Sequence, residues 1–260
     1  MTGFSRMDGR LCLVTGGTAG IGLKIAETLL DAGATVVING RDIKRGAIAL
    51  EKLEHNPRAF FEVGDCSDPV KSREMVERVV EAHGAISALI VSGGAAQCPP
   101  ALFKDLSDKD FLEVYQTQFL NRVFPIRASL MHMQENGGSI VILGTDAGRH
   151  ATIGEALHGS IGSAKIMLTK TLAREFGRWH IRVNCLALTI TSGTEAFDAV
   201  MTGEAWAQKI FKKAVERFPF GQPPEVEEVA RVALFLASDQ SAQITGQTIS
   251  VNGGLSFGGW

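Results

Sequence analysis

"TGGTAGIG", residues 15–22, decides the fold, because it joins a strand-like segment to a helix-like one. The apolar run "RLCLVTG" (10–16) leads into it, and "GIGLKIAETLLDAG" (20–33) follows with helical periodicity and closes on Gly33. Glycines at such a turn let the backbone bend tightly and approach a pyrophosphate, which then rests on the helix N-terminus. A tight turn without a ligand has the same composition. The strand before and the helix after it favour dinucleotide binding.

Strand-like and helix-like segments alternate along the rest of the chain. Further strands are predicted at 34–40, 59–65, 86–94, 138–144, 181–188 and 246–254. Helices are predicted between the second strand and His55, and at 68–84, 107–134 (with a kink at Pro125), 156–176 and 225–237. Such βαβ units build a doubly wound α/β fold, a parallel Rossmann sheet of about seven strands with helices on both faces, in a single domain spanning 1–260.

One long segment, 189–224, shows no clear periodicity and is rich in glycine and proline. A segment of that length inside a compact domain is more often a functional lid than a domain boundary, so a substrate lid is predicted there. Its aromatic residues either line an apolar pocket or pack the lid onto the body. They are Phe197, Trp206, Phe211, Phe218 and Phe220.

Composition excludes several classes of protein. Hydrophobic residues make up 45% of the chain, and Lys plus Arg (26) nearly balances Asp plus Glu (28), for a formal charge of −2. This balance gives no reason to expect nucleic acid or an acidic membrane as a partner. The N-terminus lacks the apolar region of a signal peptide, no apolar run reaches the ~18 residues of a membrane span, and the four cysteines form no CxxC pair. A cytoplasmic protein is predicted.

The glycine spacing, T-G-x-x-x-G-I-G, resembles that of the short-chain dehydrogenase/reductase family. "SGG" (92–94), "IRVN" (181–184) and "ITGQTISVNGG" (244–254) extend the resemblance over nearly the whole chain. It implies a nicotinamide dinucleotide held by the loops after the first four strands. The residues it assigns to the cofactor are Gly16, Thr18, Gly20, Ile21, Gly22, Arg41, Asp65, Cys66, Ser92 and Gly94.

The end of the second predicted strand bears on the choice between NAD and NADP. A carboxylate there bonds the ribose hydroxyls of NAD, but this chain has Gly40, followed by Arg41. A guanidinium fits a 2′-phosphate, so NADP(H) is favoured over NAD(H). Arg41 also suits an ordinary surface position, and Ala19 stands where the family often carries a second basic residue.

The catalytic positions of the family hold different residues here. Family members use Asn, Ser, Tyr and Lys. The segments "GSIVILGT" (138–145) and "LTKTLAREF" (168–176) align with the family without a gap. The alignment places Thr145 at the serine, His158 at the tyrosine, Gly162 at the lysine and Gln118 at the asparagine. The chain therefore resembles an atypical member that lacks the Tyr-x-x-x-Lys pair.

These replacements form a chemically coherent set. A phenol of pKa about 10 needs a neighbouring cation to exchange protons near neutrality, whereas an imidazole of pKa about 6.5 does not. His158 is therefore the candidate acid/base, and Thr145 keeps a hydroxyl for a substrate oxygen. In the plainer reading His158 only caps or packs. Gly162 leaves room either for a ligand or for close helix packing. Lys165, one turn further, either replaces the lost lysine or carries its charge to the surface.

The sequence thus predicts an NADP(H)-dependent oxidoreductase acting on the carbonyl, alcohol or enone of a small hydrophobic or cyclic substrate. The alternatives are a non-redox isomerase, dehydratase or cyclase on the same scaffold, and a non-catalytic partner subunit. The resemblance also implies a homodimer or homotetramer built through the long fourth helix and the catalytic helix. Asp146, His150, Glu155 and His158 gather near the fifth strand, but their spacing matches no ligand pattern, so no metal is expected.

Overall fold

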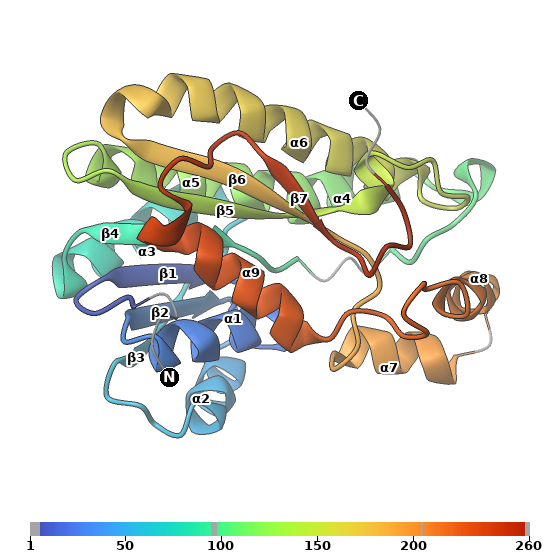
Figure 1. Cartoon of the computed structure of the whole chain (residues 1–260), viewed down its shortest axis with the longest axis horizontal. Coiled ribbons are helices and arrows are strands. Elements are labelled where there is room, and N and C mark those ends of the chain that lie inside the picture. The colour runs from blue at the N-terminus through green and yellow to red at the C-terminus, as the bar shows by residue number, and fades with distance from the viewer. Residues whose placement is uncertain (1–5, 95–97, 204, 258–260) are drawn as a thin grey trace.

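The strands of the computed structural model form one parallel sheet (Figure 1). The structure describes residues 6–94, 98–203 and 205–257, and within them seven strands lie in the order β3-β2-β1-β4-β5-β6-β7. Their bounds are β1 Leu11–Thr15, β2 Thr35–Gly40, β3 Ala59–Val63, β4 Ile86–Val91, β5 Gly138–Thr145, β6 Ile181–Leu188 and β7 Thr248–Val251. The predicted doubly wound sheet is confirmed.

Helices cover both faces of this sheet, because the strands are apolar on both sides. In β1, Cys12 and Val14 join one core cluster, whereas Leu11 and Leu13 join the other. The first cluster is covered by α1 (Gly20–Asp31), α2 (Ile43–Lys52) and α9 (Val226–Ala237), and the second by α3 (Pro69–His83), α5 (Asn121–Met133) and α6 (Ala156–Phe176). In the part of the chain that the structure describes, no helix has the length and hydropathy to cross a bilayer.

The predicted helix at 107–134 contains a widened turn. It begins as α4 (Asp108–Tyr115), where Ser107 and Asp110 form a capping box. Residues Gln116–Leu120 then form a π-helical turn before α5. The change in helical pattern therefore precedes Pro125, the residue at which a kink was expected. Such single π turns are frequent at functional sites.

The predicted lid, 189–224, is not irregular throughout. It contains α7 (Glu195–Thr202) and α8 (Trp206–Val215), which lie beyond the carboxyl end of β6 in Figure 1. Thr194 caps α7, with its Oγ1 accepting from the Phe197 backbone amide at 3.1 Å. The sequence concealed these helices because they are short and Gly203 interrupts the pattern between them.

Candidate active site

The glycine loop lies where the order of strands reverses. β1 is followed in sequence by β2 on one side, and its other neighbour in the sheet is β4. Such a switch point opens the crevice in which α/β sheets bind ligands. Gly16, with φ +64°, meets Gly93 there, and a Cβ on Gly16 would lie 2.6 Å from the Gly93 nitrogen. Only glycines allow these two loops to meet.

The N-terminus of α1 faces open space beside this crossing. Its N-cap residue, Ala19, makes no side-chain capping bond, so the first-turn amides keep their donors available. Gly20 has φ +52°, and the nearest atom to a Cβ there would be Thr194 Cγ2 at 3.9 Å. An open cradle at a helix N-terminus fits a pyrophosphate.

At the other end of the crevice, the loop after β3 presents the Asp65 carboxylate and the Cys66 thiol. The Asp65 carboxylate accepts from the Ser67 amide at 2.9 Å and the Ser67 hydroxyl at 2.6 Å. The Cys66 thiol donates to Asn39 Oδ1 at 3.1 Å, and burial raises the pKa of this thiol to about 12. Cys66 is therefore a neutral donor and not a reactive thiolate.

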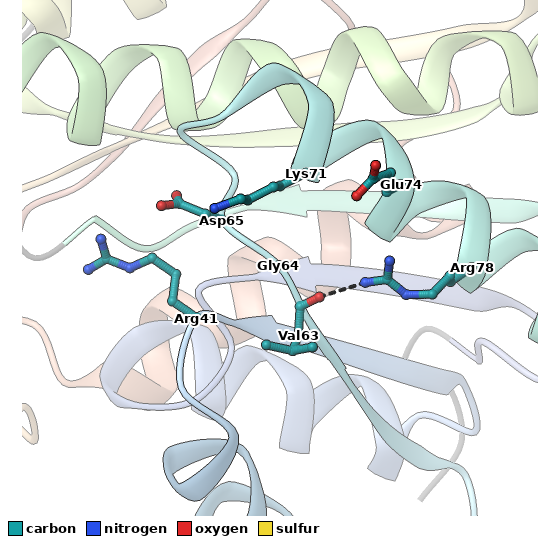
Figure 2. Close-up of a pocket in the computed structure, with 7 residues that line it drawn as sticks. All are labelled: Arg41, Val63, Gly64, Asp65, Lys71, Glu74 and Arg78. Carbon is teal, nitrogen blue, oxygen red and sulfur yellow. Dashed lines mark hydrogen bonds between the residues drawn. The ribbon is translucent and has the colours of Figure 1, made fainter.

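A second, smaller cavity of about 380 Å³ adjoins this end. Arg41 and Asp65 line both cavities. In Figure 2, Arg41 and Arg78 lie on opposite sides of the Val63–Gly64 segment, and Arg78 donates to the Val63 carbonyl at 2.7 Å. Arg41 is exposed.

One cavity of about 1220 Å³ gathers the residues predicted from the sequence. All ten cofactor candidates line it, and so do His158, Thr145 and Gln118. The cavity extends from Arg41 and Arg45, past the glycine loop, to α6 and the lid residues Glu195 and Phe211. A volume of this size accommodates a dinucleotide and a small second molecule.

Thr145 and Gln118 hold the cavity wall in shape. Thr145 Oγ1 accepts from the Ala147 amide at 3.3 Å and so caps the short 3₁₀ turn Asp146–Gly148. Its hydroxyl proton remains available for a ligand oxygen. The Gln118 side-chain amide donates to the Gly94 carbonyl and ties the π turn to the loop after β4.

His158 lies in the first turn of α6 and faces the loop after β4. Its Nε2 lies 3.2 Å from the Cys98 carbonyl, so Nε2 carries a proton and donates it there. Burial lowers the pKa of His158; the bond to Cys98 raises it, and the charge of Lys165 lowers it. The imidazole is therefore neutral near pH 7.

Gly162 serves close helix packing, one of the two interpretations left open. A Cβ there would lie 2.8 Å from Thr145 Cγ2 and 2.9 Å from Gly148 Cα. The reverse contact is as tight, since a Cβ on Gly148 would lie 2.5 Å from the Gly162 carbonyl carbon. Position 162 therefore packs against the 3₁₀ turn and leaves no room for a ligand.

The expectation that Lys165 carries its charge to the surface was wrong. Lys165 is only 4% exposed, and its Nζ donates to the Leu143 carbonyl at 3.4 Å. Burial, followed by the charge of Arg122, lowers the pKa of Lys165 well below its ordinary value. This lysine is a buried group of the cavity wall.

Sequence reasoning missed Arg122. Its Nε donates to the same Leu143 carbonyl at 3.3 Å, and a terminal nitrogen donates to Asn121 Oδ1 at 2.7 Å. Burial lowers the pKa of Arg122 to about 10. The signal was present, because Arg122 shares a helical stripe with the buried Ile126, Ser129 and Met133.

The polar cluster near the fifth strand separates into two parts. Asp146 Oδ1 accepts from Arg149 at 3.1 Å and from Ser250 at 3.0 Å, so it ties the 3₁₀ turn to β7. Glu155 instead lines the cavity with His158, and burial raises the pKa of this carboxyl. Only Glu155 therefore adds to the candidate site.

The lid aromatics also divide. Phe211 lines the cavity and Phe218 is buried, whereas Phe220 is exposed. Trp206 packs against Gly154, where a Cβ would meet its ring at 2.9 Å. Both predicted roles are thus present, since Phe211 faces the cavity and Trp206 attaches the lid to the body.

Comparison with known proteins agrees with this geometry. A family model described as enoyl-(acyl carrier protein) reductase matches residues 16–256. The chain is 31% identical to the 3-oxoacyl-[acyl-carrier-protein] reductase FabG of Chlamydia pneumoniae, over 96% of this chain and 98% of that protein. It is 30% identical to the FabG of Thermotoga maritima, over 96% of this chain and 99% of that protein.

Solved structures agree as well. A short-chain type dehydrogenase/reductase from Mycobacterium ulcerans superposes with a TM-score of 0.88 at 25% identity, covering 96% of this chain and 90% of that one. A protein described as a short chain dehydrogenase/reductase family protein gives a TM-score of 0.82 at 31% identity, covering 96% and 98%. The chain belongs to the short-chain dehydrogenase/reductase family of oxidoreductases.

Proposed function

We propose that this protein is an NADP(H)-dependent oxidoreductase that interconverts a carbonyl and an alcohol on a small hydrophobic or cyclic substrate. The observation that carries the proposal is the single cavity of about 1220 Å³, which joins the glycine loop to Thr145 and His158. The two curated relatives named above are 3-oxoacyl-[acyl-carrier-protein] reductases, which supports carbonyl chemistry. Phe211 and Ile161 supply apolar surface beside the candidate catalytic groups.

The residues at the glycine loop fit a dinucleotide. The pyrophosphate is expected on the open cradle of Gly20 at the N-terminus of α1, and the adenosine between Arg41 and Asp65. Arg41 and Arg45 both line this end, and Gly40 offers no carboxylate to repel a 2′-phosphate. The bound nicotinamide supplies or accepts a hydride at the carbon that changes oxidation state.

Two side chains act on the substrate oxygen in the proposed reduction. The Thr145 hydroxyl donates a hydrogen bond to the carbonyl oxygen, since its own acceptor side is already occupied by Ala147. His158 delivers a proton from Nε2 to that oxygen while its Nδ1 takes one up from solvent, so that the ring returns to its neutral form. In this structure the Nε2–H is donated to the Cys98 carbonyl. The substrate carbonyl would replace the Cys98 carbonyl as the acceptor of this hydrogen bond. The catalytic set is therefore non-standard, with an imidazole in place of a phenol.

Cofactor binding and turnover test this proposal separately. NADPH is titrated by its fluorescence, and its oxidation is followed with a panel of small cyclic and aliphatic ketones, for wild type, His158→Ala, Thr145→Val and the control His132→Ala. We expect NADPH binding in all four and loss of turnover by 10²-fold or more only in the first two variants. Substrate loss that depends on His158 without NADPH oxidation would support the non-redox alternative instead.

Arg41 carries the choice of cofactor in this proposal. We expect Arg41→Ala to weaken NADPH binding about tenfold and to leave NADH binding unchanged, because it removes a charge-assisted bond to the 2′-phosphate. Lys44→Ala is the matched control, since Lys44 is an exposed cation on the same segment that does not line the cavity. Equal NADPH affinity in wild type and Arg41→Ala would refute the assignment.

We also propose that the protein self-associates as a homodimer or homotetramer through α4, α5 and α6. These helices expose large apolar side chains, including Leu112, Met131 and Met167. Sedimentation of wild type and Leu112→Glu tests this. A monomeric wild type at micromolar concentration would exclude it.

A further inference from the structure

Two buried cations face the same backbone oxygen without a carboxylate between them. Arg122 Nε and Lys165 Nζ lie 3.3 Å and 3.4 Å from the Leu143 carbonyl, and the side chains are 5% and 4% exposed at most. Among residues 6–94, 98–203 and 205–257, neither cation takes part in an ion pair. In the described part of the chain, the hydrogen-bond acceptors found for the two cations are neutral: the Leu143 carbonyl for both and Asn121 Oδ1 for Arg122.

Such an arrangement is costly for the folded protein. An isolated buried cation loses its hydration, and a second cation beside it adds repulsion. The charge of Arg122 lowers the pKa of Lys165 in the same way as burial does. Hydrophobic side chains of similar volume would fill these positions at lower cost, so the presence of two cations favours a role in ligand binding.

Both cations border the main cavity despite their burial. Each lines the main cavity, together with Leu143, Thr145 and His158. Leu143 and Thr145 are two residues apart on β5. Two residues of extended strand span about 7 Å. An anion at Arg122 and Lys165 would thus lie a few bonds from an oxygen held by Thr145.

We propose that Arg122 and Lys165 form a receptor for a carboxylate on the substrate. This proposal rests on the proposed function and narrows its substrate class to short-chain oxo acids and the corresponding hydroxy acids. The oxo group lies at Thr145 and His158, and the carboxylate, a few carbons away, accepts hydrogen bonds from the guanidinium and the ammonium. A fork of guanidinium donors beside an ammonium suits the two oxygens of a carboxylate.

The phosphates of the dinucleotide have other partners in this cavity. The open amides at Gly20 and the guanidinium of Arg41 lie on the loops after β1 and β2, whereas Arg122 and Lys165 belong to α5 and α6. The two anion sites therefore lie on different parts of the wall, one for the cofactor and one for the substrate.

Binding at this site should take up a proton. The groups that face Lys165 are Arg122 from α5, the neutral Cys185 thiol from β6 and His158 on its own helix, and none supplies a negative charge near neutrality. A bound carboxylate supplies one and favours the ammonium form of Lys165. Proton uptake on binding is a readout that does not depend on turnover.

The test uses levulinate, a five-carbon oxo acid, and its neutral methyl ester as probes. Isothermal titration with and without saturating NADP⁺, from pH 7 to 10 in pairs of buffers of different ionisation enthalpy, measures affinity and locates the pH range in which binding takes up a proton. We expect levulinate to bind wild type at least tenfold more tightly than the ester, with proton uptake. Arg122→Gln and Lys165→Met should abolish this preference, and Lys165→Met should also abolish the proton uptake.

Matched controls come from the same helices. Arg127→Gln on α5 and Lys170→Met on α6 each remove one exposed charge, and both should retain the levulinate preference. Circular dichroism shows which variants fold, and Lys165→Gln replaces Lys165→Met if the latter does not. The conservative Arg122→Lys should restore part of the preference.

Several outcomes would overturn the receptor. Equal affinity of wild type for levulinate and its ester would do so, as would inorganic phosphate binding with the same dependence on Lys165 but no preference for levulinate. Weaker NADPH binding in both variants with unchanged levulinate binding would assign the cations to the cofactor. If the protein oxidises NADPH with neutral ketones and shows no preference for a carboxylate, only the carboxylate receptor is refuted. If it binds levulinate selectively but oxidises no NADPH, only the proposed redox function is refuted.

Discussion

The two ends of the main cavity are built by different means. At the glycine loop, the backbone forms the cavity wall: Gly16 permits the crossing with Gly93, and Gly20 leaves the N-terminus of α1 open. At the α6 end, side chains form the wall, namely His158, Thr145 and the buried Lys165. Backbone sites require glycine at fixed positions, whereas side-chain sites accept several chemistries on one scaffold. The first end is therefore expected to keep its family pattern, whereas the second is free to diverge.

Gly16→Val should have the largest effect, because it damages the backbone-built end. The new Cβ would overlap the Gly93 backbone, and φ +64° disfavours a branched side chain. We expect the free energy of unfolding to fall by about 3 kcal/mol or more. Urea denaturation monitored by circular dichroism measures it.

Gly20→Ala is the matched comparison at the same loop. It also has a positive φ but meets no atom closer than 3.9 Å, so it should cost only about 1 kcal/mol. It should nevertheless weaken NADPH binding, because the Cβ occupies the cradle proposed for the pyrophosphate. Equal destabilisation by Gly16→Val and Gly20→Ala would contradict the packing argument.

Restoring the lysine of the family should fail at the α6 end. In Gly162→Lys, the Cβ would meet Thr145 Cγ2 and Gly148 Cα at 2.8 and 2.9 Å, so the turn after β5 must shift. We expect a loss of about 2 kcal/mol in unfolding free energy, typical of overpacking, and no gain in NADPH oxidation even beside His158→Tyr. Stable protein with increased turnover from the double variant would show that the close contact with Gly148 is not a constraint.

The sequence predicted the fold well, and the residues it assigned to the glycine-loop end line one cavity, for a physical reason. Strand periodicity, helix caps and obligatory glycines are local signals, so "TGGTAGIG" could be assigned without knowing its neighbours. The α6 end depends on which side chains from different elements meet. Arg122 and Lys165 are 43 positions apart and meet only at the Leu143 carbonyl, a contact that no local pattern encodes. The apolar helical stripes on which they lie indicated burial. Their charge indicated the opposite, because Arg and Lys are usually surface residues.

Lys165→Met should stabilise the free protein, which would show that this end trades stability for binding. The pKa of Lys165 is lower folded than unfolded, so the unfolded state binds more protons and stability rises with pH up to the unfolded value near 10.4. Replacement by methionine should raise the unfolding free energy at pH 7 by about 1 kcal/mol and flatten that slope. Denaturation from pH 7 to 10, beside Lys170→Met, measures both. Destabilisation by Lys165→Met at every pH would mean that the amine holds the Leu143 carbonyl to net advantage.

His158→Gln should have the smallest effect, visible only in the pH dependence. The pKa of His158 is lowered, mainly by burial. The folded protein therefore holds the neutral imidazole, while His158 in the unfolded chain is protonated below about pH 6.5. Wild-type stability should therefore fall as the pH drops from 6.5 toward 5, and His158→Gln, which keeps an amide donor for the Cys98 carbonyl, should fall less. Thermal melts at pH 5, 6 and 7 measure the difference. The glutamine amide keeps the packing but has no group that titrates. Parallel pH profiles of stability for the two proteins would mean that the pKa of His158 is the same in the folded and unfolded protein. An imidazole with an unshifted pKa would be a poor candidate for a buried acid at the α6 end.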